Sequence, residues 1–72
     1  MLNLLFKTDK QAIAYAKSNE LEIDKKQVNV GLTGFEGQDG APENFSGESM
    51  AFVARDNGGN VIGYLAYWES EL

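Results

Sequence analysis

Only one short run of this sequence has the composition of a helix, and this limits the fold more than any other feature. The run opens with TDKQ, a capping-box pattern in which the Thr8 hydroxyl accepts from the amide of Gln11 and the Gln11 side chain reaches back. Strong helix formers then predict a helix over residues 9–18, with Asn19 as a left-handed C-terminal residue. The apolar stripe of this helix is narrow and mostly made of small residues: Ala12, Ile13 and Ala16.

The other apolar runs have the pattern of strands. Apolar residues alternate with other residues in LNLLF at 2–6 and in QVNVGL at 27–32, which predicts half-buried strands. Residues 50–54 and 60–69 predict two more strands. The order β-α-β-β-β indicates an α+β fold, with one helix packed on one face of a small three- to four-stranded, mostly antiparallel sheet.

Glycines and two apolar residues add local expectations. Asn57-Gly58-Gly59 tolerates the positive φ angles of a tight hairpin turn between the last two strands. Gly63, inside the last strand, indicates a bulge or a close approach of another backbone segment. Leu21 and Ile23 are expected to tuck under the end of the helix.

Residues 33–49, TGFEGQDGAPENFSGES, predict a long Gly-rich loop. They hold four of the eight glycines and the only proline. Loops longer than about 12–15 residues are uncommon in compact domains and are usually functional or disordered. Phe35 and Phe45 are expected to anchor this loop, and residues 1–72 are expected to form a single domain.

Three large aromatic residues, Tyr64, Tyr67 and Trp68, crowd the last predicted strand. Adjacent strand residues point to opposite faces, so Tyr67 and Trp68 cannot both lie under the helix. At least one of them therefore lies on the face that the helix leaves open. Two interpretations follow: the long loop folds back, with Phe35 or Phe45 covering that face, or the aromatic surface meets another protein or a second copy.

The net charge of −5 is unevenly divided along the chain. Residues 1–26 hold five lysines and four acids, whereas residues 27–72 hold Arg55 and seven acids. The acidic part repels phosphate backbones, which argues against direct nucleic-acid binding and favours a partner with a basic groove. A moderate negative charge that only keeps a small protein in solution is the alternative.

The residue types that most often carry catalysis are missing, because the chain has no cysteine and no histidine. The acids in EGQDGAPEN do not follow the order of a calcium-binding loop, and no phosphate-binding glycine motif occurs. We therefore expect no enzyme, no cofactor and no metal. A small-ligand or calcium site in the Gly-rich loop remains an alternative function.

Residues 52–68, FVARDNGGNVIGYLAYW, resemble the first hairpin of the acetyl-CoA-dependent N-acetyltransferases. The glycine-rich loop with which that family binds the pyrophosphate of acetyl-CoA does not occur in this sequence, so no function is carried over from the resemblance. At the start, the apolar patch of MLNLLFKTDK is too short for a signal peptide, and no run reaches the ~18 apolar residues of a membrane span. A cytoplasmic protein without membrane contact is expected.

These observations together predict a small acidic, non-enzymatic protein-binding domain. It would be an inhibitor or modulator that blocks a larger protein sterically and electrostatically, as mobile-element or phage inhibitors, anti-defence proteins, antitoxins and immunity proteins do. The acidic half could act as a nucleic-acid mimic in a basic groove. A homodimeric structural or accessory module is a second possibility. The expected contact residues are Tyr64, Trp68, Glu69, Glu36 and Asp39.

Overall fold

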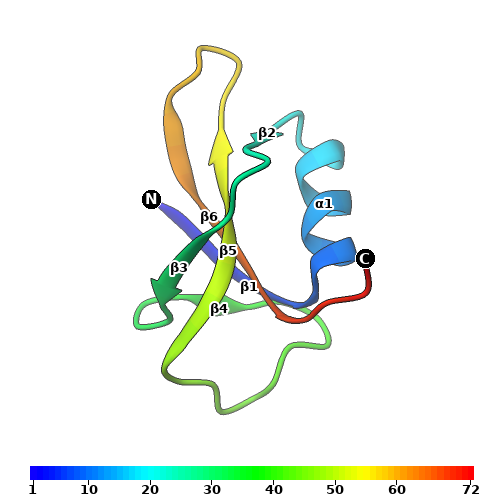
Figure 1. Cartoon of the computed structure of the whole chain (residues 1–72), viewed down its shortest axis with the longest axis vertical. Coiled ribbons are helices and arrows are strands. Elements are labelled where there is room, and N and C mark those ends of the chain that lie inside the picture. Colours follow the sequence, from blue (N-terminus) through cyan, green and yellow to red (C-terminus); the bar gives the residue numbers. More distant parts are fainter.

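The first strand is the centre of a parallel arrangement. In the computed structural model, which describes residues 1–72, β1 (Leu2–Thr8) lies between β6 (Val61–Glu69) and β4 (Glu36–Gly37) and runs parallel to both. Its residue Leu4 faces Leu65 on one side and Glu36 on the other. The segment that begins the chain is therefore flanked by strands far away in the sequence (Figure 1).

The rest of the sheet is antiparallel. Strand β5 (Glu48–Arg55) forms a hairpin with β6, and β2 (Glu22–Ile23) and β3 (Val28–Gly31) both pair with the other side of β5. The result is a six-stranded mixed sheet in the order β2-β5-β6-β1-β4, with β3 beside β5. The α+β class with one helix is thus as predicted, whereas the three- to four-stranded, mostly antiparallel sheet is wrong. Two of the six strands contain only two residues each, too few for a periodic pattern.

Helix α1 (Asp9–Ser18) has the predicted bounds, and its capping box is present. The amide of Gln11 donates to Oγ1 of Thr8 over 3.2 Å, and the amide of Thr8 donates to Oε1 of Gln11 over 3.3 Å. The prediction of a left-handed Asn19 is wrong, because its φ angle is −108°. Glu20 takes the left-handed conformation instead, with φ at 56°.

The end of α1 explains this one-residue difference. The amide of Leu21 donates to the oxygen of Ala16 and the amide of Glu20 to that of Lys17, the two bonds of a Schellman motif. Asn19 remains in the last turn, where its side-chain amide donates to the oxygen of Tyr15. The motif turns the chain so that Leu21 and Ile23 pack against the main core, as expected.

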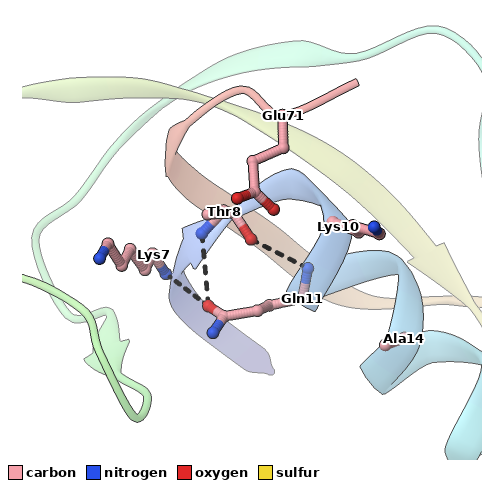
Figure 2. A pocket seen from close by; sticks show the side chains of 6 residues that line it. All are labelled: Lys7, Thr8, Lys10, Gln11, Ala14 and Glu71. Atoms are coloured by element: carbon pink, nitrogen blue, oxygen red, sulfur yellow. Dashed lines mark hydrogen bonds between the residues drawn. The ribbon is translucent and has the colours of Figure 1, made fainter.

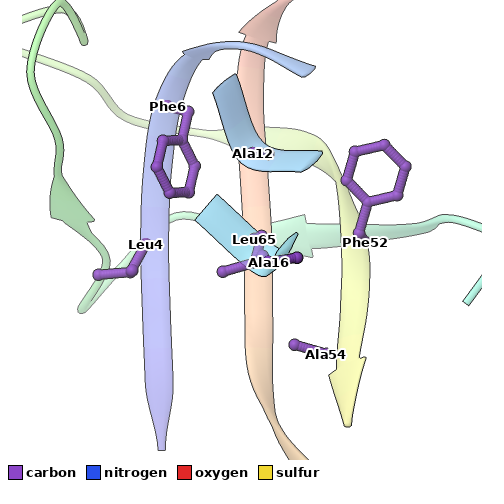
Figure 3. Packing of buried hydrophobic residues seen from close by; sticks show 7 residues of the cluster. All are labelled: Leu4, Phe6, Ala12, Ala16, Phe52, Ala54 and Leu65. Carbon is purple, nitrogen blue, oxygen red and sulfur yellow. The ribbon is translucent and has the colours of Figure 1, made fainter. Parts of the chain in front are cut away.

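The main core lies between α1 and one face of the sheet (Figure 3). Three strands supply its large side chains, and α1 supplies two alanines that let the helix approach closely. The ring of Phe6 lies 5.5 Å from that of Tyr15 on the helix. The buried residues of this core are Leu4, Phe6, Ala12, Ala16, Phe52, Ala54 and Leu65.

A second, smaller core fills the opposite face of the sheet. Leu5, Ala51 and Ala66 point to this face and are buried together with Leu32. Residues 32–47, here called the covering segment, close over them. Phe35 and Phe45 of this segment pack against the second core, as expected, together with Val30, Ala41 and Tyr64.

The covering segment is more ordered than the predicted loop over 33–49. It contains β4, and the amide of Gln38 donates to the oxygen of Leu5 over 2.8 Å. The amide of Leu32 donates to the oxygen of Gly47, which closes the two ends of the segment on one another. Backbone bonding and two aromatic side chains therefore hold it on the sheet.

Gly63 combines both features expected of it. Ala54 faces Gly63 and Arg55 faces Val61, so Ile62 is an extra residue that forms a bulge in β6. At the hairpin turn, only Gly59 has a positive φ angle, and the carboxylate of Asp56 accepts from the amides of Gly58 and Asn60. The structure has no helix that is both long and apolar enough to cross a membrane.

Candidate protein-binding surface

The three aromatic residues of β6 have different environments. Tyr67 lies on the helix side, half-buried, with its ring 5.6 Å from that of Phe52 and its hydroxyl bound to the side chain of Gln27. Tyr64 lies on the other face, half-buried against the second core. Trp68 remains 51% exposed. The interpretation that the loop folds back is therefore right for Tyr64, and the open aromatic surface is reduced to Trp68.

Trp68 is exposed because it lies beyond both layers that cover the sheet. Its neighbours on β6 face Phe6 and Thr8 of β1, so the residue of β1 beside Trp68 is Lys7. The covering segment reaches only as far as Lys7, where the α-carbon of Gly40 packs within a side chain's length of it. On the opposite face, α1 begins directly after β1. Neither layer has an apolar side chain that reaches the indole.

The other expected contact residues are all exposed, but they are not equally close to Trp68. Glu69 follows it and ends β6, opposite Thr8. Asp39 lies next to Gly40, in the part of the covering segment that reaches Lys7. Glu36 lies farther along β1, opposite Leu4. The structure thus places Glu69 and Asp39 on either side of Trp68 and leaves Glu36 towards the middle of the sheet.

A buried carboxylate fixes the chain after Trp68. One oxygen of Asp9 accepts from the amide of Glu71 over 2.8 Å, and the other accepts from the hydroxyl of Ser70 over 2.9 Å. Burial alone would raise the pKa of Asp9, but these hydrogen bonds outweigh it and lower the pKa below its ordinary value of 3.8. Asp9 therefore holds residues 69–71 beside the start of α1.

Sequence reasoning missed this contact. Asp9 was expected only as a negative charge in the first helical turn, where it suits the helix dipole. Its partners lie 61 and 62 positions away along the chain, and no local pattern links them. The pairing arises because the parallel strands β1 and β6 end at the same edge of the sheet, so that the residues after each strand meet.

The negative charge of the protein is concentrated at the end of the sheet where β1 and β6 finish and β5 begins, here called the Trp68 end. This end and the covering segment carry two lysines, Lys7 and Lys10, against the buried Asp9 and six exposed acids. In the other half of the molecule, four basic and four acidic side chains balance, and Arg55 and Asp24 form an ion pair of 3.0 Å. The six exposed acids are Glu36, Asp39, Glu43, Glu48, Glu69 and Glu71.

A shallow, open hollow of about 340 Å³ lies beside this end, at the start of α1 (Figure 2). The backbone groups around it are already used, because Oε1 of Gln11 accepts from the amides of both Lys7 and Thr8. Its free polar groups are the amines of Lys7 and Lys10 and the carboxylate of Glu71. These groups are exposed and carry opposite charges, so the hollow is a poor trap for either an anion or a cation.

The acids of the covering segment do not converge. No group of three acidic side chains is placed to hold a metal ion. The arrangement at the Trp68 end is thus an exposed indole among dispersed carboxylates, which suits contact with a macromolecule better than enclosure of a small one. Comparisons with protein-family models, curated proteins and solved structures found no match to this chain.

Proposed function

We propose that this protein is a small acidic, non-enzymatic domain that binds a larger protein through its Trp68 end and acts by covering part of that protein's surface. The observation that carries the proposal is the 51% exposure of Trp68 on a sheet whose two faces are otherwise covered. Tryptophan is among the residues that contribute most binding energy when an interface buries them. Glu69 and Asp39 would lie at the rim of such a contact.

The charge of the Trp68 end supports a basic partner. Carboxylates arranged around an apolar anchor accelerate encounter with a positive surface and disfavour other partners. The same charges oppose the pairing of two copies through this end, which favours a different protein over a homodimer. Association should therefore slow as salt is added, because screening acts over about 10 Å at 0.1 M ionic strength.

The size of the molecule is compatible with action by covering alone. The chain has an accessible surface of 4644 Å², and a standard interface takes about 800 Å² from each partner. Such an interface would occupy about a sixth of this surface, roughly one end of the molecule. A domain bound in this way would block a site on the partner sterically without any reaction of its own.

The test compares three immobilised forms of the chain in an extract of the cells that carry its gene. Trp68→Ala removes the anchor, and Val61→Ala is the matched control, because Val61 is also an exposed apolar residue of β6 but lies at the opposite end. We expect the wild type and Val61→Ala to retain the same protein and Trp68→Ala to lose it. Recovery of the same proteins by all three forms would refute the proposal.

Two measurements complete this test. Circular dichroism of Trp68→Ala should match that of the wild type, because a half-exposed side chain contributes little to the core. The mass in solution addresses the homodimer. A monomer at micromolar concentration agrees with the proposal, whereas a dimer that Trp68→Ala dissociates would assign the Trp68 end to self-association.

A further inference from the structure

The Trp68 end combines an exposed aromatic face with an excess of negative charge. We infer that its partner is a protein that binds single-stranded nucleic acid, and that Trp68 and its neighbouring carboxylates occupy the places of a base and its phosphates. This inference rests on the proposed function and names the class of partner.

The first step of the argument is the chemistry that single-strand-binding proteins recognise. They combine a basic groove, which follows the phosphates, with aromatic side chains on which bases stack. Such a site accepts any flat π-system because every base offers one. The indole of Trp68 is the only aromatic side chain of this protein that is more exposed than buried, and it therefore is the one group that can be stacked from outside.

The second step is the placement of charge around the indole. Asp39 lies in the part of the covering segment that reaches Lys7, the neighbour of Trp68 on β1. Glu69 follows the indole, and the hydrogen bonds of Asp9 fix Glu71 just beyond. A negative charge thus lies on either side of an aromatic group along a short stretch of surface, as in a strand of nucleic acid.

The third step separates this partner from two others. A groove that reads duplex nucleic acid through its phosphates alone would use the carboxylates and gain little from the indole. A purely apolar pocket would accept any large apolar side chain at position 68 and would not need the charges. The combination favours a surface that uses stacking and charge together. Lys7 is the one cation beside Trp68 on the sheet, so Lys7→Gln should strengthen binding to such a surface.

The experiment starts from a nuclease-treated extract passed over the immobilised wild-type chain. The bound protein is eluted with a short oligothymidine or with a duplex of the same length and is then identified and purified. Fluorescence anisotropy next measures how well the wild type, Trp68→Phe and Trp68→Leu displace labelled oligothymidine from it. Phenylalanine keeps a face for stacking, whereas leucine keeps only apolar bulk.

We expect oligothymidine to elute the protein better than the duplex does. Trp68→Phe should compete nearly as well as the wild type, whereas Trp68→Leu should need about a tenfold higher concentration or more, as for the loss of one stacked base. Equal elution by both nucleic acids, or equal competition by the leucine and phenylalanine variants, would overturn the inference.

The two proposals fail differently. If no protein is retained in a manner that depends on Trp68, the proposed function itself is wrong. If a protein is retained through Trp68 but no nucleic acid elutes it, the proposed function stands and its partner is of another class. If the chain itself binds labelled oligothymidine, its own surface and not a partner's groove is the nucleic-acid site, and the inference is overturned.

Discussion

The backbone oxygen of Leu2 occupies the place where Gly63 would carry a side chain. A Cβ on Gly63 would lie 1.7 Å from that oxygen and 2.5 Å from the carbonyl carbon, far inside any contact distance. The glycine is therefore required for β1 to pair with β6 next to the bulge at Ile62, and the close approach joins the two longest-range neighbours in the sheet.

Gly63→Ala should destabilise the protein by about 3 kcal/mol or more, because backbone atoms must move apart rather than a flexible side chain. Urea unfolding followed by circular dichroism measures this change. Gly31→Ala is the matched control, since a Cβ on that strand glycine meets nothing within 4 Å. Equal effects of the two substitutions would contradict the role given to Gly63.

Glu20 is the only residue other than glycine with a positive φ angle. Glycine adopts this conformation without the steric cost that a Cβ brings, so Glu20→Gly should stabilise the protein by about 0.5–1 kcal/mol. Asn19→Gly should not, because Asn19 is not left-handed and its side chain bonds to the oxygen of Tyr15. Thermal unfolding of both variants measures the difference, and a gain from Asn19→Gly would contradict this account of the helix end.

Asp9 should make stability depend on pH in acid. Its folded-state pKa lies below the ordinary value of 3.8, so the charged carboxylate stabilises the folded state above that value. This contribution is lost as the pH falls below 3.8 through the folded pKa. Asp9→Ala should cost about 1–3 kcal/mol at neutral pH, the range for hydrogen bonds to a charged group, and should lose less stability on acidification.

Urea unfolding of the wild type and of Asp9→Ala at neutral and acid pH measures both effects. Asp39→Ala serves as the control, because Asp39 is an exposed acid for which the structure gives no hydrogen bond. If Asp39→Ala changed the pH dependence as much as Asp9→Ala did, the acid sensitivity would come from net charge and not from the bonds to Ser70 and Glu71.

Phe45 should control the opening of the covering segment. It packs against the second core, and its removal leaves Phe35 and Leu32 as the remaining large side chains there. In Phe45→Ala, the amide of Gln38, which donates to Leu5, should exchange with solvent faster. The amide of Leu21, which donates to Ala16 at the end of α1, should change less.

Hydrogen exchange followed by NMR resolves these amides one by one. Glu43→Ala is the control in the same segment, because its exposed side chain adds nothing to the second core. Equal acceleration at Gln38 and Leu21 in Phe45→Ala would mean that the covering segment does not open separately from the rest of the molecule.

Local chemistry was sufficient to predict some elements of this fold. The bounds of α1 follow from its capping box and the absence of glycine and proline, and the requirement for Gly63 follows from its place in a strand. The alternation of residues 2–6 correctly marks which side chains face the helix. It carries no information on which strand lies beside them or in which direction, so the parallel pairing of β1 with β6 and β4 could not be predicted.

The candidate site was predictable only in part, for a related reason. A single short helix cannot cover both faces of a sheet, which indicated an exposed aromatic residue on β6. Which residue this is depends on how far the covering segment reaches, and Gly-rich sequence does not specify a path. The structure leaves Trp68 exposed and half-buries Tyr64. The distant bonds of Asp9 to Ser70 and Glu71 have no sequence signal at all.

The position of β1 between β6 and β4 has a consequence for synthesis on the ribosome. Residues 2–8 emerge first, but their longest partner, residues 61–69, emerges almost last. Until then, the alternating leucines of β1 have no neighbouring strand to hold them, and the helix that follows has only a partial surface to pack on. Since distant contacts must form together, assembly should be late and cooperative, and a nascent chain stalled before residue 61 should remain sensitive to protease.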